Sequence, residues 1–154
     1  MRKIVTDYGC DYTEFCKKTY DEVLVNAKAK ENASEVLQKL KQEGNEIIII
    51  TARTEKAYNE PYETSYKFLV HNNIPFDKLL VGKLNKGQAC KEEGIDIFID
   101  DNLDNCYNIK KYGIDVILYD SPLNQDNNDF KRVKNFNELY EILRKWYSGK
   151  YIRC

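Results

Sequence analysis

The fold is decided by two short aliphatic stretches, Ile47-Ile48-Ile49-Ile50 followed by Thr51, and Ile97-Phe98-Ile99 followed by Asp100 and Asp101. Apolar runs of this length without polar alternation are typical of strands that are buried on both faces of a parallel sheet. The abrupt change to a hydroxyl or to two carboxylates marks the carboxyl end of each strand. Since ligands of open α/β sheets bind at that edge, the sequence predicts a functional site that contains Thr51, Asp100 and Asp101.

Helical and strand patterns alternate along the rest of the chain. Apolar residues recur at helical spacing, and the glycines at 44, 94 and 113 are expected to end helices. Asn32 and Glu35 resemble the capping pair of a helix that begins near residue 33. Such alternation demands parallel βαβ units with helices on both faces, so we expect a three-layer α/β fold. The expected strands are 46–50, 78–81, 96–99 and 115–119, and the expected helices are 12–27, 33–43, 62–72, 86–93, 103–112 and 136–146.

Length, charge and cysteine content exclude some classes of partner and of site. The chain has 154 residues, which suits one domain with a real core, and its net charge of −1 argues against a nucleic-acid or membrane partner recognised by bulk charge. No apolar run approaches membrane length and no signal peptide is recognisable, so a cytoplasmic location is expected. The 5 cysteines are odd in number and lack metal-type spacing, which disfavours both a disulfide framework and a zinc site.

The order of the polar residues suits phosphoryl transfer. That reaction needs Mg²⁺ to neutralise phosphate oxygens, a cation on the phosphoryl group and a hydroxyl that orients it. Asp100 and Asp101 are suitable ligands for the ion. Lys86 could supply the cation and Thr51 the hydroxyl. Arg53 lies two residues beyond Thr51 and could reach a phosphate or another edge of the substrate.

Each of these residues also has a purely structural interpretation. Asp101 or Asn102 could cap a following helix, because carboxylates and amides are favoured at helix N-termini. Thr51 could simply end a strand, and Lys86 could be an ordinary surface lysine. Only the ordered combination favours a phosphate site over these alternatives.

Three segments carry a family resemblance, namely Ile47–Arg53, Asn85-Lys86 and Ile97–Asn102. Their order and spacing resemble motifs II, III and IV of haloacid-dehalogenase-type (HAD) phosphatases, and more narrowly the bacterial relatives of the cytosolic 5′(3′)-deoxyribonucleotidases. The resemblance extends over residues 12–146. Further segments that support it are 32–37, 60–63, 120–124, 130–133 and 137–140.

The resemblance implies a Mg²⁺-dependent phosphomonoesterase that acts on a phosphorylated small molecule such as a nucleoside monophosphate. Thr51 would then hydrogen-bond the transferring phosphoryl group, and Lys86 would neutralise it. One of Asp100 and Asp101 would ligate Mg²⁺, and the other would support that ligand or a nearby cation. Arg53 would contribute to substrate binding. The family's mechanism is attack by an aspartate, formation of an aspartyl-phosphate and hydrolysis by water.

The family's first motif, a strand that ends in Asp-x-Asp-Gly, has no counterpart here. Asp7 follows the short apolar piece 3–6, but Gly9 stands two residues later. Residues 13–26 resemble the last helix of the family's small cap domain, so one interpretation is that the chain begins inside the cap and lacks the catalytic strand. The other is that residues 3–6 substitute for that strand and that Asp7 is a lone nucleophile.

These interpretations lead to one domain division and two leading functions. Residues 1–28 are expected to be a cap remnant or a substitute strand with a helix, residues 29–148 a HAD-like core and residues 149–154 a frayed tail. Loss of a central strand would leave unpaired sheet edges, which a homo-oligomer could cover. The first function is a nucleotidase impaired by loss of its nucleophile, and the alternative is an inactive module that binds phosphate or metal.

Two other function classes fit the motifs poorly. A receiver-like phosphoacceptor domain also carries carboxylates, a threonine and a lysine at the edge of an α/β sheet, but in the reverse order along the chain. A dinucleotide-binding domain needs a glycine-rich turn after a strand, and the sequence has none.

Overall fold

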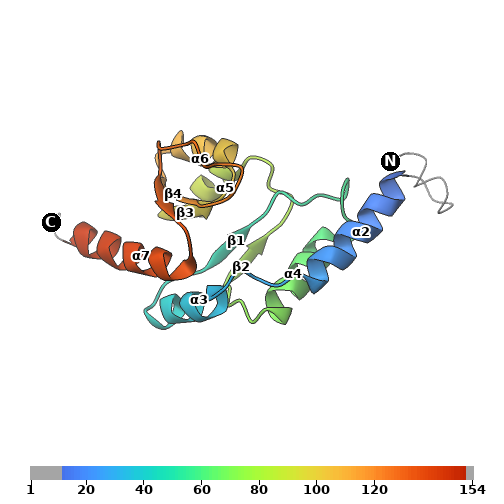
Figure 1. Cartoon of the computed structure of the whole chain (residues 1–154), viewed down its shortest axis with the longest axis horizontal. Coiled ribbons are helices and arrows are strands. Elements are labelled where there is room, and N and C mark those ends of the chain that lie inside the picture. The colour runs from blue at the N-terminus through green and yellow to red at the C-terminus, as the bar shows by residue number, and fades with distance from the viewer. Residues whose placement is uncertain (1–11, 152–154) are drawn as a thin grey trace. The chain divides into compact units, whose positions relative to one another are not determined.

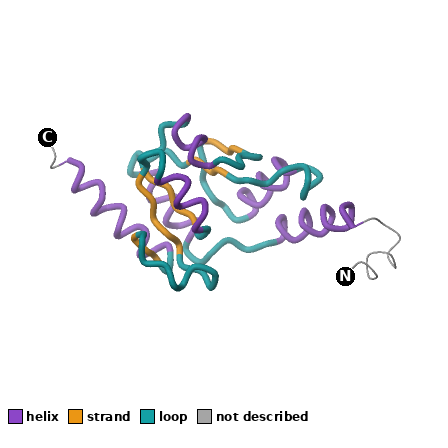
Figure 2. The backbone as a smooth tube through the Cα atoms, turned by 90° about the horizontal axis from the view of Figure 1, so that it is seen from above, coloured by secondary structure: helices purple, strands orange, loops and turns teal. Residues whose placement is uncertain are grey.

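The computed structural model describes residues 12–151, with side chains described for residues 14–147. The chain forms two compact units, each made of segments that are distant in the sequence. The first unit contains residues 12–29 and 46–84, and the second contains residues 30–45 and 85–151. Helices and strands alternate along the chain between residues 33 and 119 (Figure 1, Figure 2).

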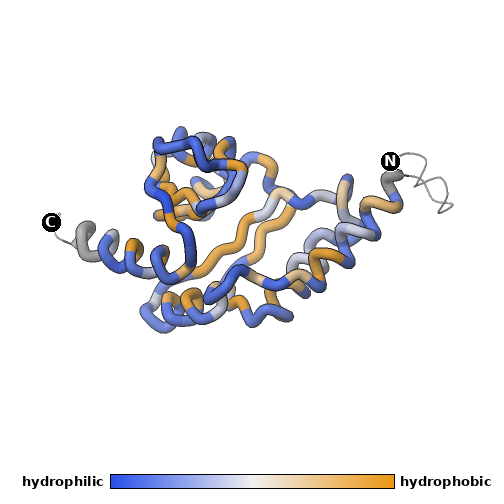
Figure 3. Tube along the Cα trace, in the orientation of Figure 1, coloured by the Kyte–Doolittle hydropathy of each residue, from blue (hydrophilic) through white to orange (hydrophobic). Residues whose placement is uncertain are grey.

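The first unit is a strand–helix–strand unit with one additional helix. Its elements are α2 (Tyr12–Asn26), β1 (Ile48–Ile50), α4 (Pro61–His71) and β2 (Lys78–Leu80). The two strands pair in parallel, with Ile48 opposite Lys78 and Ile50 opposite Leu80. Figure 3 shows both strands as largely apolar, as expected of strands in a parallel sheet. Helix α2 packs along α4.

Asp21 on α2 holds the start of α4 in place. Its carboxylate accepts a hydrogen bond from the Thr64 hydroxyl at 3.1 Å. It also accepts bonds from the backbone and side-chain amides of Asn59 at 3.1 and 2.9 Å. Pro61 occupies the start of the helix, where a residue without an N–H and with a fixed φ is well tolerated. The loop before α4 is therefore anchored by a neighbouring helix.

The second unit contains a three-stranded parallel sheet in the order β3-β4-β5. Its strands are β3 (Ile97–Asp100), β4 (Asp115–Tyr119) and β5 (Lys131–Val133). Its helices are α3 (Ala33–Gln42), α5 (Lys86–Glu92), α6 (Leu103–Lys110) and α7 (Phe136–Tyr151). Helix α6 packs on β3 and β4 with α5 beside it, and α7 contacts β5 and α3.

The core of the second unit is built on β4, which lies in the middle of its sheet. Leu118 on this strand and Ile109 on α6 are fully buried, as is Val133 on β5. Gly87 on α5 allows a close approach to α6, because a Cβ at this position would lie 2.5 Å from the Tyr112 ring and 2.6 Å from the Asn108 side-chain oxygen. That oxygen instead accepts a hydrogen bond of 2.7 Å from the Gly87 amide.

The parallel pairing and the alternation of elements confirm the predicted α/β fold class. The predicted strand 115–119 has the bounds of β4. Strand β5 was not predicted, and α7 extends to Tyr151 beyond its expected end. The predicted capping role of Asn32 is wrong, since this residue adopts a left-handed conformation with φ of 61° and its side chain makes no capping bond.

Several expectations remain predictions. Residues 3–6 and Asp7 lie outside the described residues, so the substitute strand and its nucleophile stay a hypothesis. The division into a cap remnant, a core and a tail also stays a prediction. Within residues 12–151, no helix has the length and apolar character needed to cross a membrane.

Truncation of a β4 side chain tests the core of the second unit. We expect Leu118→Ala to lower the free energy of unfolding by about 2–5 kcal/mol, because it removes buried methyl groups and leaves a cavity. Leu123→Ala is the matched control, since Leu123 is 94% exposed and its truncation should change stability by less than about 0.5 kcal/mol. Urea unfolding followed by circular dichroism measures both. Equal effects of the two substitutions would contradict the assigned core.

Candidate functional site

The carboxyl end of β3 carries an ion pair that is almost completely buried. Asp100 Oδ2 accepts a hydrogen bond of 2.7 Å from Lys86 Nζ and one of 3.0 Å from Asn105 Nδ2. Asp100 Oδ1 accepts a third bond, of 2.9 Å, from the backbone amide of Asn102. The side chains of Lys86 and Asp100 are only 13% and 7% exposed. A carboxylate in this position is stable because it accepts hydrogen bonds from three donors, one of which is positively charged.

Lys86 reaches this carboxylate because of the way α5 begins. Asn85 caps the helix, with its side-chain oxygen accepting from the Gln88 amide at 3.1 Å. The next residue, Lys86, is then the first of the helix and extends toward the end of β3. Its ammonium group also lies 5.7 Å from the centre of the Phe98 ring, a distance at which cation–π attraction contributes.

Asp101 follows the strand and is exposed, in contrast to its neighbour. The residue that caps α6 is Asn102, whose side-chain oxygen accepts from the Asn105 amide at 3.0 Å. Of the two capping residues considered from the sequence, the structure therefore uses Asn102. Asp101 directly follows Asp100 in the sequence, and its side chain is exposed to solvent.

Two cysteines lie beneath this site. Cys90 on α5 and Cys106 on α6 are both fully buried, and the Cys106 thiol donates to the Asp100 carbonyl at 3.7 Å. Burial raises the pKa of Cys90 to about 11, with Lys86 lowering it and Asp100 raising it to smaller degrees. Burial also raises the pKa of Cys106 to about 12, with a further contribution from Asp100. Both thiols are therefore protonated at neutral pH, and the side chains pack as small apolar groups.

Thr51 and Arg53 belong to the first unit, at the carboxyl end of β1. The Thr51 amide donates to the Leu80 carbonyl at 2.9 Å, and its carbonyl accepts from the Lys83 amide at 3.0 Å. Gly82, with φ of 75°, makes the turn that brings Lys83 back to this position. Thr51 is thus fixed by backbone bonds, with its side chain half-buried.

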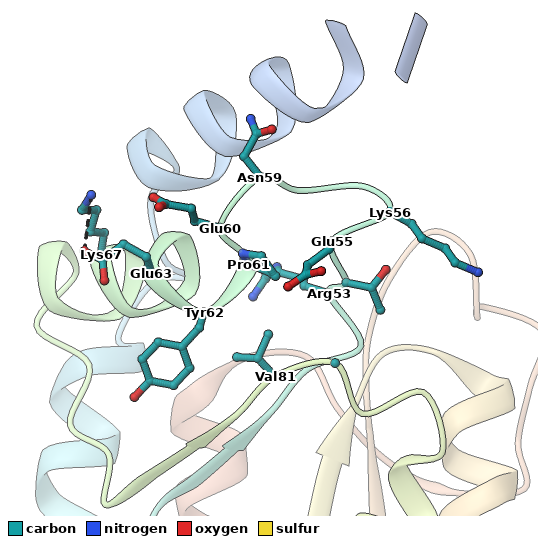
Figure 4. Close-up of a pocket in the computed structure, with 12 residues that line it drawn as sticks. Arg53, Glu55, Lys56, Asn59, Glu60, Pro61, Tyr62, Glu63, Lys67 and Val81 are labelled. Carbon is teal, nitrogen blue, oxygen red and sulfur yellow. Dashed lines mark ion pairs between the residues drawn. The ribbon is translucent and has the colours of Figure 1, made fainter. Parts of the chain in front are cut away.

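Arg53 lines an open pocket of about 1010 Å³ at the start of α4 (Figure 4). Its guanidinium donates to the Ser65 hydroxyl at 3.3 Å, and Ser65 in turn donates to the Pro61 carbonyl at 2.6 Å. Side chains of both charges line the opening. The residues that line the pocket are Arg53, Thr54, Glu55, Lys56, Asn59, Glu60, Pro61, Tyr62, Glu63, Lys67, Val81 and Gly82.

The structure thus brings together three of the five residues predicted for the site. Lys86 and Asp100 are in direct contact, and Asp101 is adjacent to them in the second unit. Thr51 and Arg53 lie in the first unit, and their joint action with the other three stays a prediction. Asn105, which binds Asp100, was missed because nothing in the sequence distinguishes it from other polar residues at the start of a helix.

The residues at the end of β3 fit Mg²⁺ better than they fit a softer metal. Among the described residues, no group of three or more acidic, histidine or cysteine side chains gathers that could hold a metal by itself. Mg²⁺, however, is commonly held by one or two carboxylates together with water and phosphate oxygens. The exposed carboxylate of Asp101 is a hard oxygen donor of that kind, and the nearby thiols are buried and protonated.

Comparisons with known sequences concern most of the chain. Residues 13–147 match the protein family described as 5′ nucleotidase, deoxy (pyrimidine), cytosolic type C protein. A nucleotidase of Clostridium acetobutylicum is 29% identical over 140 residues, which cover 89% of this chain and 70% of that protein. A protein of Halalkalibacterium halodurans is 34% identical over an alignment that covers 92% of this chain and 77% of that protein.

Solved structures show the same fold at lower sequence identity. A HAD-superfamily hydrolase from Ehrlichia chaffeensis matches with a TM-score of 0.55 and 19% identity, covering 86% of this chain and 72% of that chain. A dehalogenase matches with a TM-score of 0.61 and 16% identity, covering 90% of this chain and 66% of that chain. Because these identities are low, the similarity extends to the fold alone.

Removal of the lysine tests the ion pair. We expect Lys86→Met to lower the free energy of unfolding by about 3 kcal/mol, because it leaves the Asp100 carboxylate buried without a positive partner. The matched control is Lys67→Met, which breaks an exposed ion pair of 3.4 Å with Glu63 and should change stability by less than about 0.5 kcal/mol. Chemical unfolding measures both. If Lys86→Met lowered the free energy of unfolding by less than about 1 kcal/mol, the structural importance of the pair would be contradicted.

Alkylation tests the environment of the two buried thiols. At pH 8, a thiol with a pKa near 11 is only about 0.1% thiolate, so Cys90 and Cys106 should resist iodoacetamide in the folded protein. Their reactivity should rise only as the pH approaches 11, because deprotonation requires it. The same thiols in urea-unfolded protein are the control and should react at the ordinary rate. Mass spectrometry of the two peptides measures the alkylation rates. Equal rates in folded and unfolded protein would contradict the buried environment of the two thiols.

Proposed function

We propose that this chain, which belongs to the cytosolic type C 5′-nucleotidase family of HAD-type hydrolases, binds Mg²⁺ and the phosphate of a nucleoside monophosphate at the carboxyl end of β3. The observation that supports this most directly is the enclosed Lys86–Asp100 ion pair beside the exposed carboxylate of Asp101. A positive charge and a free carboxylate at the end of a parallel strand suit a metal–phosphate ligand.

Asp101, Lys86 and Asp100 would each have a different role in binding. Asp101 would hold Mg²⁺, which supplies charge neutralisation for the phosphate oxygens when it is bound. Lys86 carries three donor hydrogens, and its bond to Asp100 leaves others for a phosphoryl oxygen. Asp100 would hold the Lys86 ammonium group in position through their hydrogen bond.

For Thr51 and Arg53, which lie in the first unit, a role in binding is proposed from the family resemblance of their segment. The hydroxyl of Thr51 would donate to a phosphoryl oxygen, which matches its position at the end of β1. Arg53, at the pocket before α4, would contact another part of the nucleotide. The mixed charges around that pocket suit the polar groups of a nucleoside better than a purely apolar ligand.

Hydrolysis by this chain is proposed to be impaired. The family's mechanism uses a nucleophilic aspartate and a second aspartate two residues later, and the 154 residues contain no two aspartates with that spacing. The same observation favours a second candidate function, a module that binds metal or phosphate without turnover. Asp7 is the residue that could still serve as a nucleophile.

Calorimetry tests the binding part of the proposal. Titration with a deoxyribonucleoside monophosphate should show binding that depends on Mg²⁺. Asp101→Asn should weaken Mg²⁺ binding more than about tenfold, because loss of a unit charge next to the ion removes a few kcal/mol of attraction. Asp104→Asn, the same change at an exposed position on α6, should leave Mg²⁺ affinity within about twofold. Equal effects of the two substitutions would contradict the proposed role of Asp101.

A hydrolysis assay tests the chemical part. We expect negligible turnover of deoxyribonucleoside monophosphates and of p-nitrophenyl phosphate with Mg²⁺, because groups that only orient a phosphate retain a small part of the acceleration. If the starting chain is active and Asp7→Asn abolishes turnover, Asp7 is a working nucleophile and the impaired function is wrong. Activity that survives Asp7→Asn would contradict both interpretations.

A further inference from the structure

Asn124 is a buried amide whose hydrogen-bonding groups all have partners. It is 2% exposed and lies in the loop after β4. Its Nδ2 donates to the Asp101 carbonyl at 2.8 Å and to the Tyr119 carbonyl at 2.9 Å. Its Oδ1 accepts from the Ser121 amide at 3.2 Å and from Arg132 Nη1 at 2.6 Å. One side chain therefore joins the carboxyl ends of β3 and β4.

The orientation of this amide is unambiguous. Carbonyl oxygens can only accept hydrogen bonds, and guanidinium and backbone N–H groups can only donate them. The reversed amide would place an oxygen against two carbonyls and an NH₂ group against two donors. Asn124 is therefore a donor toward the carbonyls of Asp101 and Tyr119.

Arg132 on β5 holds the loop that carries Asn124. Its Nη1 also donates to Asp120 Oδ1 at 2.7 Å, and its Nη2 donates to the carbonyls of Asn124 and Asn127, both at 2.7 Å. The hydrogen bond from Arg132 lowers the pKa of Asp120, with a smaller contribution from Gln125. The planar guanidinium, with donors in fixed directions, matches this set of acceptors as a lysine could not.

These bonds restrain the peptide group that follows Asp101. Its N–H, which belongs to Asn102, donates to the Asp100 carboxylate, and its carbonyl, which belongs to Asp101, accepts from Asn124. The Asp101 carboxylate, in contrast, is exposed and available to a ligand. Asn124 thus fixes the backbone of the residue whose side chain is proposed to bind the ion.

We propose that Asn124, oriented by Arg132, is a positioning residue that sets the Mg²⁺ affinity of Asp101. The inference rests on the proposed function, in which Asp101 is the ligand. Groups that hold a metal ligand in place are commonly important for affinity, and their loss weakens metal binding by about 10–100-fold. Asn124 touches neither the ion nor the substrate in this role, and it acts through the backbone of Asp101.

Asn124→Asp is the most informative variant. The carboxylate keeps the size of the side chain and can still accept from Ser121 and Arg132, but it turns an acceptor toward the carbonyls of Asp101 and Tyr119. We expect the Mg²⁺ dissociation constant, measured by calorimetry, to rise about tenfold or more. The added negative charge by itself would strengthen cation binding, so weaker binding would come from the lost donor.

The matched control is Asn128→Asp, which makes the same change at an exposed position of the same loop. It should leave the Mg²⁺ dissociation constant within about twofold. Arg132→Lys is the second variant, and it keeps the positive charge while losing the fork that orients Asn124. It should weaken Mg²⁺ binding in the same direction, and it decides the question if Asn124→Asp does not fold.

Amide hydrogen exchange supplies a readout that is independent of the ion. Exchange of the Asn102 amide should be faster in Asn124→Asp than in Asn128→Asp, because the turn at Asp101 is released. Unchanged exchange and unchanged Mg²⁺ affinity in the folded variants would overturn the inference. If the starting protein binds no Mg²⁺, the proposed function is contradicted, and exchange at Asn102 still decides whether Asn124 positions Asp101.

Discussion

The ion pair between Lys86 and Asp100 is the interaction on which the second unit's site depends. It joins the first residue of α5 to the last residue of β3, so it links a helix start to a strand end. Because both side chains are mostly buried, their attraction is weakly screened by solvent, and neither can be removed without leaving a charge in an unfavourable place. The pair also gives the two aspartates different surroundings. Asp100 binds Lys86, whereas Asp101 is exposed to solvent.

Two helices and one strand, α5, α6 and β3, meet at this pair, and polar contacts hold them. Asn85 starts α5, Asn102 starts α6, and Asn105 on α6 returns to Asp100. Cys90 on α5 and Cys106 on α6 are fully buried, and their thiols, with raised pKa values, pack as apolar groups. The site is therefore supported by packing below and by amides around it, and this arrangement lets two neighbouring carboxylates have different surroundings.

The sequence was sufficient for the parts of the fold that follow from local pattern. Aliphatic runs that end in polar residues located β1, β3 and β4, and glycines marked helix ends. Strand β5 was not predictable, because two of its three residues are charged. It forms a strand only by pairing with β4 in the folded sheet. The capping role of Asn32 was wrong, since this residue adopts a left-handed conformation with φ of 61° and its side chain makes no capping bond.

The candidate site shows the same division between local and tertiary information. The order of Lys86 and the two aspartates could be read from the sequence, but their different roles could not, because either Asp101 or Asn102 could have capped α6. Asn124 and Arg132 lie in a segment rich in asparagine and aspartate, where nothing local distinguishes them. Their importance comes from contacts that form only when the ends of β3, β4 and β5 are adjacent.

The central claim is that the end of β3 binds a metal–phosphate ligand through Asp101 and Lys86. A crystal structure of the 154-residue chain grown with Mg²⁺ and orthovanadate, a phosphate analogue, tests it most directly. The account predicts an ion ligated by the Asp101 carboxylate and an oxyanion within hydrogen-bonding distance of Lys86 Nζ, with the Lys86–Asp100 bond retained. An ion or anion bound elsewhere, with Asp101 and Lys86 making no contact to either, would contradict it.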